Sequence, residues 1–221
     1  MIFEDELKRL KETILKMGGM VESAVKEAVH ALVERDNELA RRVIERDHQV
    51  NTLDVEIDEE SIRLIALMQP KAGDLRFITT AMKITTDLER MGDMAVNIAE
   101  RALELNEEPL LKPYIDIPRM SQIAQGMTRD ALDAFVRKDK RLAMDVIMRD
   151  DEVDTLKHDV LQELAFFMVQ DPTTVTRAMK ISFIAQYLER IADHATNISE
   201  MVIYLVEGKI IRHMELPSEN K

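Results

Sequence analysis

The chain has 221 residues, of which 46% are hydrophobic and only 4% are aromatic, with six glycines and six prolines. This composition favours long helices over a twisted sheet and predicts an all-α fold with a sizeable core. The formal net charge of −12 disfavours nucleic acid as a partner, and the absence of cysteine excludes disulfides, thiolate metal sites and cysteine nucleophiles.

Apolar residues recur at three- and four-residue steps along most of the chain, which is the period of an amphipathic helix. Asp36, Pro70, Asp139 and Pro172 interrupt this period and mark turns. The pattern predicts six helices, over approximately residues 4–34, 37–68, 78–102, 119–137, 140–168 and 173–206.

The second half of the chain repeats the first. Residues 28–60 align with 131–163 at a shift of 103, and 14 of these 33 positions are identical. After a three-residue deletion, the shift becomes 100, and LERMGDMAVNIAE from Leu88 to Glu100 aligns with LERIADHATNISE from Leu188 to Glu200. Internal similarity at this level indicates a duplicated unit.

The predicted fold class is therefore all-α, with six long helices arranged as two tandem, pseudo-symmetric three-helix bundles. Residues 1–108 are predicted as the first repeat, 117–208 as the second, and 209–221 as a C-terminal tail, with a proline-containing linker between the repeats. We expect the repeats to dock side by side, because their helices carry more apolar residues than a lone three-helix bundle would cover.

No stretch approaches the roughly 18 apolar residues that a membrane-spanning helix needs, so no membrane insertion is expected. The N-terminal residues MIFEDELKRLKE carry acids where a signal peptide carries bases, which favours a cytoplasmic location.

Acidic side chains follow one face of the third helix of each repeat. Glu89, Asp93, Asn97 and Glu100 stand at i, i+4, i+8 and i+11, and their counterparts are Glu189, Asp193, Asn197 and Glu200. A helical wheel places this face nearly opposite the apolar stripe, and therefore at the surface. The second helix of each repeat adds acids along one face, namely Asp47, Asp54 and Asp58, and then Asp150 and Asp154.

Two interpretations of these stripes remain open. Oxygen ligands from neighbouring helices suit a hard divalent cation or an iron cluster, with Glu89, Asp93 and Asp47 as the candidate metal ligands of the first half. In the second half the candidates are Glu189, Asp193, Asp150 and Asp154. The alternative is a solvated acidic face in a strongly acidic chain, with Arg76, Arg90 or Arg190 pairing with the acids.

Catalysis is not expected, and no catalytic or cofactor-binding residues are predicted. A di-iron site needs Glu-x-x-His pairs that point into the core. The two matches, Glu27 with His30 and Glu45 with His48, project away from the apolar stripes and are absent from the second half. His194 is expected to face solvent rather than to act as a general base.

The stretch PKAGDLRFITTAMKITTDLERMGD from Pro70 to Asp93, with YLERIADHATNI from Tyr187 to Ile198, resembles the PhoU family of phosphate-transport regulators. The resemblance covers nearly the whole chain, including the ending VIYLVEGKIIRH from Val202 to His213.

The resemblance implies a non-enzymatic cytoplasmic regulator of phosphate uptake and of the phosphate-starvation response, often a homodimer. It implies a negative regulator that contacts the ATPase of the phosphate ABC transporter and the phosphate-responsive sensor histidine kinase. Some members bind metal clusters through E/D-x-x-x-D motifs, which here fall on Glu89 to Asp93 and Glu189 to Asp193. Asn51 stands where the second half has Asp154, so if only one cluster forms, it is expected in the second half.

Two functions of other classes stay as alternatives. A metal-binding carboxylate bundle with iron storage or redox activity would consume oxygen with ferrous ion. A membrane-associated scaffold would be recruited without any need for metal.

Overall fold

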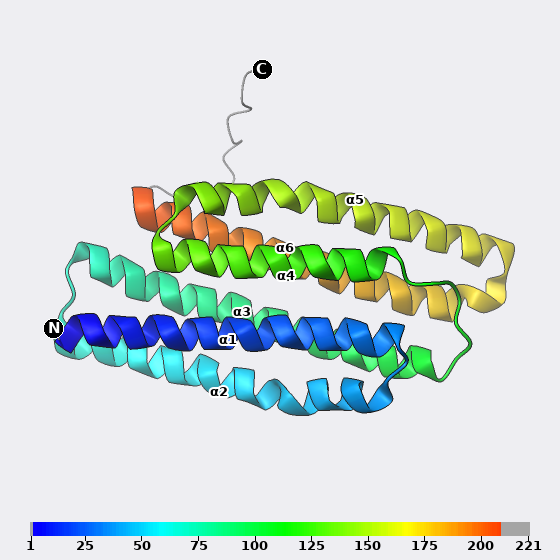
Figure 1. Ribbon diagram of the computed structural model, residues 1–221, viewed down its shortest axis with the longest axis horizontal. Helices are drawn as coiled ribbons and strands as arrows, with labels where there is room; N and C mark the ends of the chain where they lie inside the picture. Colours follow the sequence, from blue (N-terminus) through cyan, green and yellow to red (C-terminus); the bar gives the residue numbers. More distant parts are fainter. Residues whose placement is uncertain (1, 209–221) are drawn as a thin grey trace, which may run out of the picture.

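The computed structural model describes residues 2–208, and this part of the chain is helical apart from short connections (Figure 1). The expected fold class is confirmed, with six long helices and one 3-10 turn within the described residues. The elements are α1 (Ile2–Val33), α2 (Asn37–Met68), α3 (Ala72–Asn106), α4 (Asp116–Arg137), α5 (Lys140–Gln170), η1 (Pro172–Thr174) and α6 (Val175–Glu207). The predicted tail 209–221 lies outside the described residues.

The two repeats dock side by side, as expected. The inner helices α1, α3, α6 and α4 contact one another in a closed ring, while α2 packs on α1 and α3 and α5 packs on α4 and α6. In Figure 1, α2 and α5 accordingly form opposite edges of the molecule. Each outer helix therefore has a large solvent-facing surface.

The duplication extends to the helix starts. Asp36 and Asp139 occupy equivalent N-cap positions, and their side chains accept hydrogen bonds from Leu39 N at 2.9 Å and Leu142 N at 3.1 Å. Such caps satisfy a backbone N–H that has no partner within the helix. The caps fix the same starting point for α2 and α5, so the aspartates further along these helices point in equivalent directions.

Apolar side chains from both repeats share one core. Phe77 of α3 and Phe135 of α4 stack with ring centroids 4.8 Å apart, and both rings are buried. Gly18 lies so close to α4 that an added Cβ would meet Leu132 Cδ1 at 2.1 Å. Contacts of this kind are typical of a single packed interior rather than of two bundles free to swing.

The helices differ from the predicted ranges at the start of the third helix, which begins at Ala72 and not near residue 78, and at the linker. The third helix runs on to Asn106, whose Nδ2 donates to Ala31 O at 3.3 Å and to Asn37 Oδ1 at 2.8 Å, so a polar residue that suggests a loop is held within the helix. The fourth helix begins at Asp116 and includes Pro118, which was expected in the linker. Proline is tolerated there because N–H groups of the first helical turn have no partner within the helix.

No helix within residues 2–208 combines the length and the apolar character needed to cross a membrane.

Candidate functional site

The predicted acidic residues gather where the outer helix of each repeat meets the third helix. Burial raises the pKa of Asp47 on α2, and the charge of Asp93 on α3 raises it further. Burial and the charge of Asp193 on α6 likewise raise the pKa of Asp150 on α5. The stripes are not fully solvated, which corrects the helical-wheel expectation. The side chains of Glu89 and Glu189 are only 28% and 16% exposed, because α2 and α5 cover one flank of the third helices.

The first acidic cluster consists of Asp47, Asp54, Glu89 and Asp93. Burial raises the pKa of Glu89, and the charges of Asp93, Asp54 and Asp47 raise it further. Burial also raises the pKa of Asp47, against a hydrogen bond that Asn51 Nδ2 donates to its Oδ2 at 2.9 Å. Like charges without a strong cationic partner make this surface attractive to a positively charged group.

The second acidic cluster consists of Asp150, Asp154, Glu189 and Asp193. Burial, followed by repulsion from the other three carboxylates, raises the pKa of Asp150 to about 6. Burial and the charges of Glu189 and Asp154 also raise the pKa of Asp193. Burial is therefore the largest cause of the raised pKa values in both clusters, and repulsion between carboxylates adds to it.

A lysine that the sequence analysis did not single out lies inside the second cluster. Lys157 Nζ is 2.8 Å from Glu189 Oε1, and this hydrogen bond is the main reason that the pKa of Lys157 is raised. Its equivalent in the first repeat, at the 103-residue shift, is Asp54, which carries the opposite charge. A comparison of aligned positions that differ in charge would have found Lys157.

Of the arginines expected beside the stripes, Arg90 lies near Glu89 and Arg76 contacts another residue. Arg90 Nε lies 3.7 Å from Glu89 Oε2, and the arginine side chain is 62% exposed. Arg76 instead packs over the ring of Tyr204, with its guanidinium carbon 5.8 Å from the ring centroid. A solvated ion pair such as Arg90–Glu89 has a small energetic effect.

The carboxylates of each cluster do not converge on one point. Among residues 2–208, no group of three or more Asp, Glu or His side chains is placed so that it could hold a metal ion. The seven predicted metal ligands are thus neighbours in two groups, and any shared coordination would require their side chains to rotate.

The sequence predicted that both Glu-x-x-His pairs project away from the core and that His194 faces solvent. The structure agrees for the pairs and disagrees for His194. Glu27 pairs with Arg46 at 3.3 Å, while His30, Glu45 and His48 are exposed, so neither Glu-x-x-His pair points into the core. The solvent-facing prediction for His194 is wrong. Its side chain is 17% exposed, and Nδ1 lies 2.7 Å from Asp87 Oδ1, because α6 packs against α3 across the repeats.

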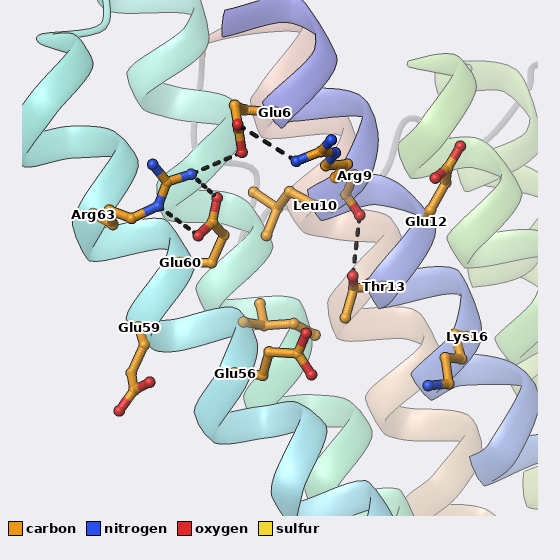
Figure 2. A pocket seen from close by; sticks show the side chains of 11 residues that line it. Glu6, Arg9, Leu10, Glu12, Thr13, Lys16, Glu56, Glu59, Glu60 and Arg63 are labelled. Atoms are coloured by element: carbon orange, nitrogen blue, oxygen red, sulfur yellow. Dashed lines mark hydrogen bonds and ion pairs between the residues drawn. The ribbon is translucent and has the colours of Figure 1, made fainter. Parts of the chain in front are cut away.

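A charged groove of about 820 Å³ runs between α1 and α2 and was not anticipated (Figure 2). Arg63 Nη2 bridges Glu6 at 2.7 Å and Glu60 at 2.5 Å, and Arg9 lies 3.7 Å from Glu6. Figure 2 shows this network reaching across the groove from α2 to α1, with Glu56 and Glu59 of α2 carrying no drawn partner. Since the network joins residues 57 positions apart, periodicity within one helix gives no signal for it.

Comparison with known proteins matches this geometry to one family. The family model described as "PhoU domain" matches residues 14–102 and 117–202, one match in each repeat. The chain is 47% identical over 216 residues to a phosphate-specific transport system accessory protein PhoU homolog of Aquifex aeolicus, covering 98% of both chains.

Two solved structures have the same fold. The crystal structure of PhoU from Pseudomonas aeruginosa superposes with a TM-score of 0.90 at 43% identity, covering 94% of this chain and all of that one (100%). The phosphate transport system regulatory protein PhoU from Streptococcus pneumoniae gives a TM-score of 0.87 at 31% identity, covering 94% and 98% of the two chains. With two family matches along its sequence and the same arrangement of six helices, the chain belongs to the PhoU family.

Proposed function

We propose that this chain is a non-enzymatic cytoplasmic regulator of phosphate uptake and of the phosphate-starvation response. It acts as a helical adaptor between the phosphate ABC transporter and its sensor histidine kinase, and holds signalling off when phosphate is plentiful. The observation that carries the proposal is the match along 98% of the chain to a protein named as an accessory of the phosphate-specific transport system. The adaptor works as a homodimer, as the resemblance implies.

The two acidic clusters support an adaptor because they offer related but distinct docking surfaces. Both combine the carboxylates of an outer helix with those of a third helix, yet Lys157 reduces the charge of the second cluster while Asp54 adds to that of the first. Partners with basic surface segments are attracted to such surfaces, and a difference in charge gives each surface a different preference.

The test is capture of the transporter ATPase and of the kinase sensor domain, each separately, on the immobilised full-length chain. Asp47→Asn with Asp93→Asn alters the first cluster, and Asp150→Asn with Asp193→Asn alters the second. Asp145→Asn with Asp159→Asn, which changes two exposed aspartates of α5, is the matched control. We expect capture of at least one partner to fall about tenfold with one cluster pair and to stay unchanged with the control.

Each capture is run with and without a chelator, which separates a direct carboxylate contact from one that needs a metal ion. Failure of the wild-type chain to capture either partner contradicts the adaptor function. Equal loss with the cluster variants and the control contradicts the role of the clusters while leaving the adaptor in place.

We further propose that phosphate is sensed indirectly, through the state of the transporter. Free phosphate is held by converging arginines, lysines or open helix N-termini, whereas the marked surfaces of this chain are acidic. Calorimetry of the purified apo protein with inorganic phosphate is expected to show no tight binding. Tight binding would contradict indirect sensing.

For the acidic clusters we propose occupancy by a hard divalent cation or an iron cluster, with the predicted ligands Asp47, Glu89 and Asp93 in one half. In the other half the ligands are Asp150, Asp154, Glu189 and Asp193. The raised pKa values of Asp150 and Asp193 support this proposal, because a cation would relieve the repulsion that contributes to them. The carboxylates must first rotate toward a common point, and in the second half Lys157 must release Glu189.

Calorimetric titration with Mn²⁺ tests occupancy, and Glu189→Ala and Asp193→Ala are expected to weaken binding without unfolding the chain. Metal occupancy is contradicted if the titration shows no heat of binding at millimolar Mn²⁺ and no iron is retained after purification. The clusters would then remain candidates for protein binding only. Measuring oxygen consumption with ferrous ion tests the alternative of iron storage or redox activity. Such a protein would consume oxygen, whereas a regulator would not.

A further inference from the structure

The first repeat contains a cavity of about 360 Å³ between α1, α2 and α3, which reaches Asp47 of the first acidic cluster and shares Lys16 with the charged groove. Its walls are mostly apolar and include Met20, Ala24, Val50 and Val96. This volume is typical of a small organic ligand, and apolar walls with a few polar groups are typical of such sites.

Two carboxylates line the cavity, Glu27 and Asp47, and the inner one is Asp47, which lies against α3. Asp47 lines the cavity beside Gly92, where Oδ1 lies 3.5 Å from the position that a Cβ of Gly92 would occupy. Asp47 accepts a hydrogen bond from Asn51 but forms no ion pair with any lysine or arginine among residues 2–208. The arginine at the mouth, Arg46, is already paired with Glu27 at 3.3 Å. The inner carboxylate is therefore available to a cation.

The second repeat offers an internal comparison at the same positions. Ala24 is replaced by Met127 and Gly92 by Ala192, and both replacements are 0% exposed. The aspartate is retained there as Asp150. The two positions that line the cavity with small residues in the first repeat thus carry larger, buried side chains in the second, which indicates that the small residues Ala24 and Gly92 help to keep this cavity open.

We propose that this cavity binds a small organic cation, with an apolar body between α1 and α3 and a primary ammonium group on the Asp47 carboxylate. Such a ligand matches both the apolar walls and the charge, because a half-buried carboxylate such as that of Asp47 binds an ammonium group better than it binds a neutral group. The lysine at the rim, Lys16, is exposed and stays in solvent. The proposal does not depend on the phosphate role. Asp47 is also a proposed metal ligand, so an ammonium group and a metal ion would compete for this carboxylate, and the experiment excludes metal ions with a chelator.

The experiment uses benzylamine as the probe and benzyl alcohol as its uncharged isostere, with the full chain in buffer containing a chelator. Ligand-observed NMR and calorimetry are expected to give a dissociation constant of about 1 mM for benzylamine and at least about tenfold weaker binding for benzyl alcohol. Asp47→Asn and the cavity-filling Ala24→Met are each expected to weaken benzylamine binding by about tenfold or more.

Two controls match these changes on the exposed surface of α5, where Asp145→Asn removes a charge and Ala165→Met adds volume. Both are expected to leave benzylamine binding unchanged. If Ala24→Met fails to fold, Gly92→Ala replaces it, since its Cβ would lie 3.3 Å from Val50 Cγ1 and narrow the cavity. The proposal is overturned by absence of benzylamine binding at 10 mM (about ten times the expected dissociation constant), by equal binding of benzyl alcohol, or by binding that survives the cavity-filling variant.

Discussion

His194 Nδ1 lies 2.7 Å from Asp87 Oδ1, and this contact joins the third helices of the two repeats. The contact has no symmetric copy, because the equivalent positions hold Met94 and Tyr187. Both side chains of the pair are more than four-fifths covered, at 17% and 16% exposed. A polar pair therefore fixes the relative position of two otherwise apolar helix faces.

Removing one member of this pair should destabilise the docked repeats. Asp87→Asn is expected to lower the free energy of unfolding by about 1–2 kcal/mol, because His194 keeps only a neutral partner in a poorly solvated position. Urea unfolding followed by circular dichroism measures the change. The control is Asp133→Asn, whose partner Arg137 is 66% exposed, and a change below about 0.5 kcal/mol is expected there. Equal effects in both variants would show that the Asp87–His194 contact has no special role.

Exchanging the charges at two equivalent positions should shift stability in opposite directions. Asp54→Lys places a cation beside Glu89 and is expected to raise the free energy of unfolding by about 0.5–1 kcal/mol. Lys157→Asp leaves Glu189 among like charges and is expected to lower it by about 1 kcal/mol or more. Thermal melting at low and high salt tests this, since screening should reduce both changes. Shifts of the same sign would contradict the electrostatic account of the clusters.

The pKa of Asp150, raised to about 6, predicts a pH-dependent stability effect. The folded pKa lies above the ordinary value of 3.8, so this group favours the folded state fully below pH 3.8 and loses that contribution as pH rises through about 6. Asp150→Asn removes the free-energy cost of an ionised carboxylate at this partly buried position. It is expected to leave stability unchanged near pH 4 and to raise it by about 1 kcal/mol at pH 7.5, after allowance for solvent screening.

Paired unfolding curves of wild type and Asp150→Asn across this pH range measure the difference. Asp145→Asn, on the exposed side of the same helix, should show no pH-dependent difference. A constant difference at all pH values would indicate that the amide changes packing and that the charge is not the cause.

Short-range sequence patterns predicted the six helices, but they did not predict the contacts between the two repeats. Asp36 and Asp139 identified the starts of α2 and α5 because a cap acts within three residues of its own position. The neighbours within each acidic cluster followed from helical spacing combined with the duplication. The contact of His194 with Asp87 could not be predicted in this way. The two residues are 107 positions apart, and their contact depends on how α3 and α6 pack against each other.

A comparison of charge and side-chain volume at aligned positions of the two repeats would have predicted further features of the structure. Lys157 aligns with Asp54, and this change of charge indicates that the two acidic clusters differ. Met127 aligns with Ala24, and this change of volume indicates the cavity in the first repeat. Both comparisons require only the alignment of the repeats. Which side of the third helix the outer helix covers could not be read from a wheel, since a helix packed on several sides has no single solvent face.

Two adjacent glycines of α1 provide a test of how tightly the repeats are docked. An added Cβ at Gly18 would meet Leu132 Cδ1 at 2.1 Å, whereas one at Gly19 would meet nothing within 4 Å. Both positions are inside a helix, where replacing glycine by a residue with a Cβ reduces the entropy lost on folding. Any difference between the two sites therefore reports on the contact with α4.

Gly19→Ala is expected to raise the free energy of unfolding by about 0.5–1 kcal/mol, through helix propensity alone. Gly18→Val is expected to lower it by about 1–3 kcal/mol, because the branched side chain must displace Leu132 from a close-packed contact. Gly19→Val is the matched control for the lower helix propensity of valine and should be nearly neutral. If Gly18→Val proves as neutral as Gly19→Val, then α1 and α4 can separate at little cost and the two repeats are not held as one packed core.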